Sequence, residues 1–368
     1  MKVCVIGGGN IGTAMAAIIS SQGHSVTIKT GKPDLWSHQI QYIDMESHQL
    51  TSAHIAQITS DASVIADADM LFVTVPSFSL AEIAKEIQPY LKKTTPLGII
   101  PGTGGMEFFL KPFIEQGYPV FGLDRVPCIA RLIEYGKSVT ASKKTSVRLG
   151  CFNYDKKELC KKVGSLLGLS CLPLDNYLTV TFTPSNPILH TARLYALYQN
   201  ASPDHCWQSN VPFYEDWDDL SSQILIACDQ ELQNICSSIT ELDLSGVIPL
   251  TVHYESATVE TMTKKISNIL AFKGIPSPMV LKDGHYILDL QSRYFTEDFP
   301  FGLCILKGFA EIFHCSTPSI DKVLQWYQDI SGQLYLTESG WNGPDLKNTA
   351  IPQNFGITTP TDVYQLYS

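Results

Sequence analysis

Two short segments carry residue types that could transfer protons and bind an anion. His190 ends the run 184–190, and Arg293 and Asp298 lie in the polar, aromatic segment 291–302. An imidazole can act as a general acid or base near neutral pH, and a carboxylate can orient it and stabilise its charged form. A guanidinium can hold a carboxylate through two parallel hydrogen bonds. Together these types suit proton transfer beside an anionic substrate.

Neither segment decides the chemistry alone. An isolated histidine is more often a packed or surface residue, and Arg293 with Asp298 could be an ordinary surface ion pair. Pro187 suits the first turn of a helix, which would place His190 about one turn in, facing a cleft between two domains. The catalytic interpretation therefore depends on the elements around these segments.

A glycine-rich segment near the N-terminus predicts a dinucleotide site. Its residues are Gly7, Gly8, Gly9, Asn10, Ile11 and Gly12. They have Gly-x-Gly-x-x-Gly spacing between a strand pattern and a helix pattern. Gly7 would allow a tight turn, Gly9 the approach of a pyrophosphate to the backbone, and Gly12 close helix packing. The helix N-terminus would add free N–H groups and partial positive charge.

The residues after the second expected strand favour NADP(H) over NAD(H). An NAD-specific site usually has an acidic residue there for the ribose 2′-hydroxyl, but none lies between Gly12 and Asp34. Lys29, Thr30 and Lys32 stand there instead. A hydroxyl and two cations would suit a 2′-phosphate, whereas merely solvated lysines would leave NAD(H) open.

The surrounding pattern predicts an α/β fold followed by a helical one. Short β-like runs alternate with helical patterns in the first half, which is typical of a Rossmann domain with a mostly parallel sheet. Later, apolar residues recur at helical steps of three and four, as in 220–239. We expect residues 1–180 to form a dinucleotide-binding domain and residues 181–368 a helical, substrate-binding and catalytic domain.

The expected strands of the first half are 2–6, 25–29, 70–75, 97–100 and 120–123. The expected helices are 11–22, 80–91, 106–116, 220–239, 259–270, 303–313, 319–329 and a last one from about 359.

Composition narrows the class of protein. The 368 residues, 44% hydrophobic and 17% charged, suit two folded domains rather than disorder. A net charge of −10 would repel phosphodiesters and anionic lipids, so we expect no nucleic-acid partner. No apolar run reaches the roughly 18 residues of a membrane span, and no signal peptide is visible. The 10 scattered cysteines, without Cys-x-x-Cys, indicate reduced thiols and a cytoplasmic protein.

Together, these motifs resemble the opine dehydrogenase family, which includes octopine and nopaline dehydrogenases. The resemblance spans nearly the whole chain. It rests on the glycine-rich start, on Asn-Pro-x-x-His at 186–190, and on an Arg followed five residues later by an Asp in a helical second domain. It includes Val75 and Pro76, which would join the cofactor site.

The resemblance implies a reductive condensation. An α-keto acid such as pyruvate and the amino group of an amino acid form an imine, whose carbon receives hydride from NAD(P)H. His190 would be the general acid and base, Asp298 its orienting partner and Arg293 the anchor of a substrate carboxylate, while Arg131 would line the cleft. Residues 124–126 depart from the family pattern and leave the amino acid undetermined; a homodimer is also left open.

Other functions stay open. Glycerol-3-phosphate dehydrogenase and ketopantoate reductase also join a Rossmann domain to a helical one, but both use a lysine at the start of the helical domain. No lysine lies between Lys162 and Lys264. A dinucleotide-binding sensor without turnover is a third function, against which His190, Arg293 and Asp298 argue. No His-Glu-x-x-His motif occurs, so we expect no metal site.

Overall fold

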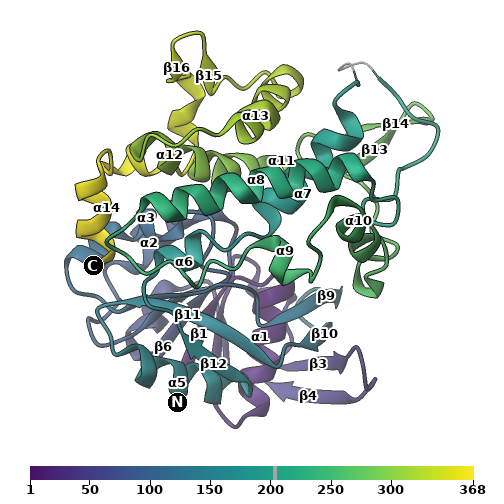
Figure 1. Ribbon diagram of the computed structural model, residues 1–368. Helices are drawn as coiled ribbons and strands as arrows, with labels where there is room; N and C mark the ends of the chain where they lie inside the picture. The colour runs from purple at the N-terminus through teal and green to yellow at the C-terminus, as the bar shows by residue number, and fades with distance from the viewer. Residues whose placement is uncertain (202–204) are drawn as a thin grey trace. The chain divides into compact units, whose positions relative to one another are not determined.

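The computed structural model describes residues 1–201 and 205–368 (Figure 1). The chain divides into two compact units, the first Met1–Thr181 with Tyr367 and the second Phe182–Leu366 with Ser368. Within the described residues, no helix is both long and apolar enough to cross a membrane.

The first unit contains an eight-stranded sheet in the order β12-β11-β8-β7-β6-β1-β2-β5. β11 is antiparallel to β8, and every other neighbouring pair is parallel. The mostly parallel sheet is therefore confirmed. The strands are β1 (Lys2–Ile6), β2 (Ser25–Lys29), β5 (Gln57–Thr59), β6 (Met70–Val73), β7 (Leu97–Ile99), β8 (Val120–Leu123), β11 (Ser146–Phe152) and β12 (Ser170–Pro173).

The helices of the first unit follow the sequence pattern with two changes caused by proline. The expected helix 106–116 is two helices, because Pro112 lacks an N–H group and its ring interferes with the preceding turn. The expected helix 80–91 ends earlier, at Ile87, because Pro89 has no N–H group with which to continue the helical hydrogen bonds. The helices are α1 (Asn10–Ser21), α2 (Leu80–Ile87), α3 (Met106–Phe109), α4 (Lys111–Glu115), α5 (Lys156–Leu167) and α6 (Leu178–Thr181).

A second sheet of four strands corrects the expectation of simple strand–helix alternation up to residue 180. Its order is β4-β3-β10-β9, with β3 parallel to β10 and the other pairs antiparallel. Helix α1 contacts strands of both sheets (Figure 1), which explains why it is apolar on every face. The strands are β3 (Gln39–Asp44), β4 (Leu50–His54), β9 (Cys128–Glu134) and β10 (Ser138–Lys143).

The second unit is mostly helical, as expected, with two short hairpins. Asp218 caps its longest helix by accepting a hydrogen bond from the Ser221 N–H. The helices are α7 (Asn186–Tyr198), α8 (Asp219–Ser238), α9 (Leu250–His253), α10 (Val259–Ser267), α11 (Arg293–Thr296), α12 (Cys304–Ile312), α13 (Pro318–Ser331) and α14 (Pro360–Tyr367). The hairpins are β13 (Met279–Lys282) with β14 (His285–Leu288), and β15 (Leu336–Thr337) with β16 (Gly340–Trp341).

Short helical turns connect these elements. A π-helical turn covers Phe299–Leu303 directly before α12. The 3₁₀ turns are Pro33–Leu35, Ala62–Asp67, Ser77–Ser79, Leu270–Phe272, Pro344–Asn348 and Pro352–Phe355.

Candidate active site

His190 lies on the first turns of α7 and has a partner on each ring nitrogen. Its Nδ1 is 2.7 Å from Oδ2 of Asp298, and its Nε2 is 2.8 Å from the hydroxyl of Tyr214. A carboxylate can only accept, so Nδ1 donates to Asp298 and Nε2 of the neutral ring accepts from Tyr214. The side chains of His190 and Asp298 are only 12% and 15% exposed. This arrangement fits a general acid and base with an oriented imidazole.

The packing of two segments brings Asp298 to His190. Asp298 immediately precedes the π-helical turn, and Gly302 within that turn lies against Pro187 at the start of α7. A Cβ atom on Gly302 would be 2.8 Å from Cβ of Pro187, so only glycine fits without displacement. The small residue thus allows the Asp298 segment to approach the helix that carries His190.

Tyr214 is buried and stays protonated. Burial, followed by the nearby Tyr294, Tyr254 and Asp298, holds the pKa of Tyr214 well above its ordinary value of 10.0. Its hydroxyl therefore keeps its proton near neutral pH and can donate it in a hydrogen bond to Nε2 of His190. The ring of Tyr294 lies 4.6 Å from that of His190, centroid to centroid, which gives the imidazole an aromatic neighbour as well.

A fully buried arginine holds the segment that carries Tyr214. Arg193 lies on α7 close after His190, and its Nε donates to the Phe213 carbonyl at 2.7 Å. Its Nη2 donates to the Asp216 carbonyl at 2.7 Å, and its Nη1 donates to Oγ of Ser221 at 3.0 Å. These bonds fix the backbone on both sides of Tyr214. Arg193 is therefore a positioning residue.

The two predicted substrate-binding arginines are both exposed. Arg293 begins α11, its side chain is 71% exposed, and its Nη2 lies 2.9 Å from Oε2 of Glu297. The alternative of an Arg293–Asp298 surface pair is not what the structure shows, because Asp298 pairs with His190 instead. Arg131 lies on β9 of the first unit, where its Nη1 donates to the Ala130 carbonyl at 3.0 Å. The anchor role of Arg293 and the place of Arg131 in the cleft stay predictions.

The glycine segment has the geometry of a dinucleotide-binding turn between β1 and α1. Gly7 adopts φ +111°, a conformation that favours glycine. A Cβ on Gly12 would collide with the Gly7 carbonyl and lie 2.6 Å from Oγ1 of Thr74. A Cβ on Gly9 would meet no atom within 4 Å, so the backbone there is open to a ligand. The residues fit a pyrophosphate held by the N–H groups at the start of α1.

Two residues of the segment also have side-chain contacts of their own. Oδ1 of Asn10 accepts from the Leu132 N–H at 2.9 Å, so its side chain holds β9 while its backbone can still face a ligand. Ile11 packs against the hydrophobic core.

Val75 and Pro76, half-buried, directly follow Thr74, whose hydroxyl donates to the Ile6 carbonyl at 3.0 Å.

The end of β2 differs in part from the expected cationic site. Lys29 is buried and forms an ion pair with Glu86, so its charge is already neutralised. Thr30 is buried, and its hydroxyl lies 3.0 Å from that of Tyr135. Lys32 is exposed. Of the two expected cations, Lys32 is the one that can face a 2′-phosphate.

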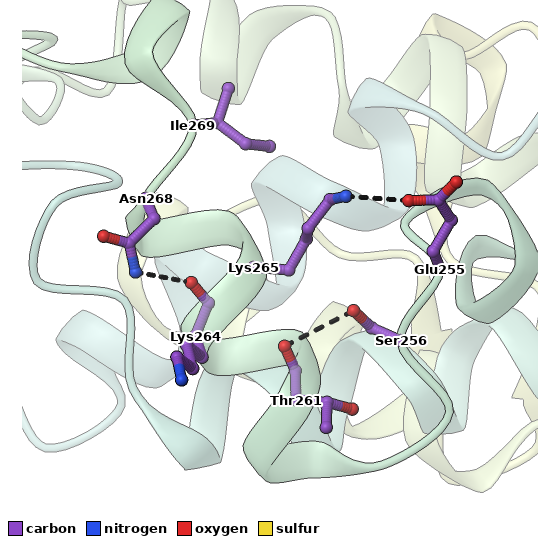
Figure 2. Close-up of a pocket in the computed structure, with 7 residues that line it drawn as sticks. All are labelled: Glu255, Ser256, Thr261, Lys264, Lys265, Asn268 and Ile269. Carbon is purple, nitrogen blue, oxygen red and sulfur yellow. Dashed lines mark hydrogen bonds and ion pairs between the residues drawn. The ribbon is translucent and has the colours of Figure 1, made fainter.

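A separate pocket of about 600 Å³ lies beside α10 in the second unit (Figure 2). Within it Lys265 pairs with Glu255 at 3.1 Å, and the side-chain amide of Asn268 donates to the Lys264 carbonyl at 2.7 Å. These polar groups are satisfied by one another, and the pocket includes none of the predicted site residues. It is lined by Glu255, Ser256, Thr261, Lys264, Lys265, Asn268 and Ile269.

Comparisons with known proteins find similar chains and folds. Residues 173–331 match the NAD/NADP octopine/nopaline dehydrogenase alpha-helical domain. The tauropine dehydrogenase of Arabella iricolor is 26% identical over 96% of this chain and 98% of its own length. The octopine dehydrogenase of Pecten maximus is 24% identical over 98% and 97%.

The chain is similar to opine dehydrogenases over nearly its whole length. It is an oxidoreductase of the class that acts on CH–NH bonds with NAD(P). Octopine dehydrogenase with NADH and L-arginine shares the fold with a TM-score of 0.87, at 22% identity, over 99% of this chain and 97% of that one.

The alternative of a glycerol-3-phosphate dehydrogenase is weaker. Residues 2–107 match the NAD-dependent glycerol-3-phosphate dehydrogenase N-terminus, which is the dinucleotide-binding half. The helical half matches the octopine/nopaline model instead. The opine dehydrogenase function therefore fits the whole chain better than either lysine-based alternative.

Sequence reasoning missed Tyr214, which contacts His190, and Arg193, which holds the segment that carries Tyr214. The aromatic run from Phe213 to Trp217, just before a well-capped helix, was a signal for Tyr214. Arg193 follows His190 by three residues, a spacing that places both near one helical face. Neither signal predicts which backbone carbonyls accept hydrogen bonds from the Arg193 guanidinium, because these carbonyls lie in the segment before α8.

Proposed function

We propose that this opine dehydrogenase condenses a pyruvate-like α-keto acid with the amino group of an amino acid and reduces the imine with NADPH, using His190 as general acid and base. The observation that carries the proposal is the His190–Asp298 pair at 2.7 Å, with a second partner on Nε2. The solved octopine dehydrogenases with pyruvate and with L-arginine support the substrate class.

The cofactor would be held by the backbone from Gly7 to Gly12. The open backbone at Gly9 and the first N–H groups of α1 would bind the pyrophosphate. Val75 and Pro76, which follow β6, would complete this site. When bound, the reduced nicotinamide supplies the hydride.

His190 would move protons at Nε2, because Asp298 engages Nδ1. As a base, Nε2 takes a proton from the substrate ammonium and frees the amine to attack the keto carbon. As an acid, the same atom protonates the hydroxyl that leaves as water when the imine forms. The carboxylate of Asp298 stabilises the imidazolium between these steps. The Tyr214 hydroxyl, 2.8 Å from Nε2, exchanges its hydrogen bond with the substrate during them.

The substrate carboxylate would be held by an exposed arginine. Arg293 has a planar fork of donors, and Glu297 contacts one of its terminal nitrogens. Arg131 is the second candidate. An exposed guanidinium can exchange its present partner for a substrate carboxylate at little cost, because a surface ion pair contributes at most about 1 kcal/mol to stability.

The preference for NADPH is supported by Thr30, by exposed Lys32 and by the absence of an acidic residue at the end of β2. The pairing of Lys29 with Glu86 removes one of the two supporting cations. Calorimetric titration with NADPH and with NADH tests the preference. Tighter binding of NADH would overturn it.

Cofactor oxidation tests the reaction itself. NADPH oxidation is followed with pyruvate plus a panel of amino acids, and with each co-substrate alone. We expect oxidation to require both co-substrates. Oxidation with a keto or phosphorylated substrate alone would favour the glycerol-3-phosphate or ketopantoate alternative, and binding without turnover would favour a sensor.

The thiols support a reducing compartment, and we place the enzyme in the cytoplasm as part of this proposal. All ten cysteines are free, and five of them are buried. Burial raises the pKa of Cys4 and of Cys128 to about 12, which keeps both thiols protonated. Sedimentation distinguishes a monomer from the homodimer that the sequence leaves open.

A further inference from the structure

Two aromatic side chains approach the glycine segment from outside the dinucleotide-binding strands. Trp36 follows the 3₁₀ turn after β2, and Tyr135 lies in the turn from β9 to β10 of the second sheet. A Cβ atom on Gly8 would be 2.7 Å from the Tyr135 hydroxyl and 2.8 Å from Cζ2 of Trp36. Both side chains therefore lie directly against the Gly8 backbone, which explains why the middle residue of the motif is also glycine.

Trp36 carries a buried N–H donor to which no residue in the described part of the chain offers an acceptor. The residue is 8% exposed, and its ring lies edge-on to that of Tyr135 with centroids 5.9 Å apart. The carbon Cζ2 that meets Gly8 is bonded to the carbon that carries Nε1, so the donor lies close to the glycine segment. Buried N–H groups nearly always have a partner, which points to a ligand oxygen.

Two hydroxyls lie at the same place. Oγ1 of Thr30 is 3.0 Å from the Tyr135 hydroxyl and would be 3.2 Å from a Cβ on Gly8. Thr30 directly follows β2, which is where dinucleotide-binding folds meet the ribose of the adenosine. An indole N–H and two hydroxyls thus converge between Gly8 and the end of β2, and exposed Lys32 follows two residues later.

We propose that Trp36 and Tyr135 bind the oxygen substituent on C2′ of the adenosine ribose, with the Trp36 N–H and the Tyr135 hydroxyl donating to it. The chemistry is that of an oxygen acceptor, either the 2′-hydroxyl of NADH or the 2′-phosphate of NADPH. This inference rests on the proposed dinucleotide function and extends it, because the β9–β10 turn of the second sheet then completes the cofactor site.

Calorimetric binding to two variants tests the assignment. Trp36→Phe keeps an aromatic ring and removes the N–H group, and Tyr135→Phe removes only the hydroxyl. The probes are NADPH and NADH, with their adenosine halves 2′,5′-ADP and 5′-AMP. We expect each variant to weaken the binding of the preferred dinucleotide and of its adenosine half by the same factor. The factor should be about threefold to tenfold if the bound group is the 2′-hydroxyl, and more than tenfold if it is the 2′-phosphate.

Trp326→Phe is the matched control, since this buried indole donates to the Tyr198 carbonyl in the second unit. Its dissociation constants should equal those of the unaltered protein. Dissociation constants within twofold for both Trp36→Phe and Tyr135→Phe would overturn the inference while leaving dinucleotide binding intact. If Trp36→Phe does not fold, Tyr135→Phe decides alone. An unaltered protein that binds neither dinucleotide overturns the proposed function and this inference with it.

Discussion

The two ring nitrogens of His190 have partners of different kinds: one is a carboxylate and the other is a neutral hydroxyl. Asp298 faces Nδ1 and can stabilise the imidazolium, whereas Tyr214 faces Nε2 and stays protonated because of its burial. Under the proposed mechanism, removal of the imidazole would abolish proton transfer itself. Removal of the phenol hydroxyl would disturb only the orientation of the ring and the hydrogen bond that we propose the substrate displaces, so the two changes should differ in size.

His190→Asn should lower kcat/KM about 100-fold or more, because asparagine keeps hydrogen-bonding capacity but cannot exchange protons near neutral pH. Steady-state NADPH oxidation measures the loss. His48→Asn is a suitable control, since His48 is exposed and has φ +57°, a conformation that asparagine tolerates. Turnover of His190→Asn within about tenfold of the unaltered enzyme would rule out the acid and base role.

Tyr214→Phe should lower kcat by about threefold to thirtyfold, the size of a lost hydrogen bond to a reacting group, with the KM of the keto acid nearly unchanged. The same change at Tyr327 removes a buried hydroxyl that donates to the Phe295 carbonyl at 3.3 Å rather than to His190. Equal kcat values for the two variants would show that Tyr214 only packs.

Arg293→Lys should raise the KM of the keto acid more than it lowers kcat, because a point charge replaces a planar fork. Arg131→Lys is the informative counterpart, as both side chains are exposed. Whichever variant raises that KM identifies the anchor. An unchanged KM in Arg293→Lys removes Arg293 from this role.

At the scale of the element, the turn between β1 and α1 combines one open glycine with one enclosed glycine. Gly9→Ala should fold normally, because a Cβ there meets nothing and φ is −80°. It should still weaken NADPH binding more than about tenfold, since the methyl group occupies the path of the pyrophosphate. Calorimetry and thermal unfolding measure the two effects.

The comparison variant is Gly12→Ala, in which the new Cβ collides with the Gly7 carbonyl. It should lose both stability and binding. Should Gly9→Ala bind NADPH as tightly as the unaltered protein, the pyrophosphate does not lie over Gly9.

Elements formed by neighbouring residues were predictable, and those formed by distant ones were not. β1, β2 and β8 have their expected bounds because each is a short apolar run closed by a turn residue. The second sheet was not predicted because β3 pairs with β10, which lies about a hundred residues later in the chain. The local sequence pattern of either strand does not indicate this pairing. The His190–Asp298 pair was predictable from a family motif, whereas the Tyr214 contact depends on a loop held by Arg193.

At the scale of the whole molecule, one buried carboxyl links folding stability to pH. Glu107 lies on α3, fully buried, and accepts hydrogen bonds from the hydroxyls of Tyr367 and Thr181. Burial, which outweighs these hydrogen bonds, raises the pKa of Glu107 from 4.5 to about 7. The folded protein therefore holds this proton more tightly than the unfolded chain does.

The contribution of Glu107 to stability is consequently largest in acid and falls as the pH rises from 4.5 to about 7, above which it is constant. Glu107→Gln cannot ionise, so the variant should gain roughly 3 kcal/mol relative to the unaltered protein between about pH 4 and about pH 8. Urea unfolding across this range measures the difference. Glu115→Gln, an exposed change on α4, is the control. A constant difference between Glu107→Gln and the unaltered protein across the whole range would mean that Glu107 is ionised equally in the folded and unfolded states.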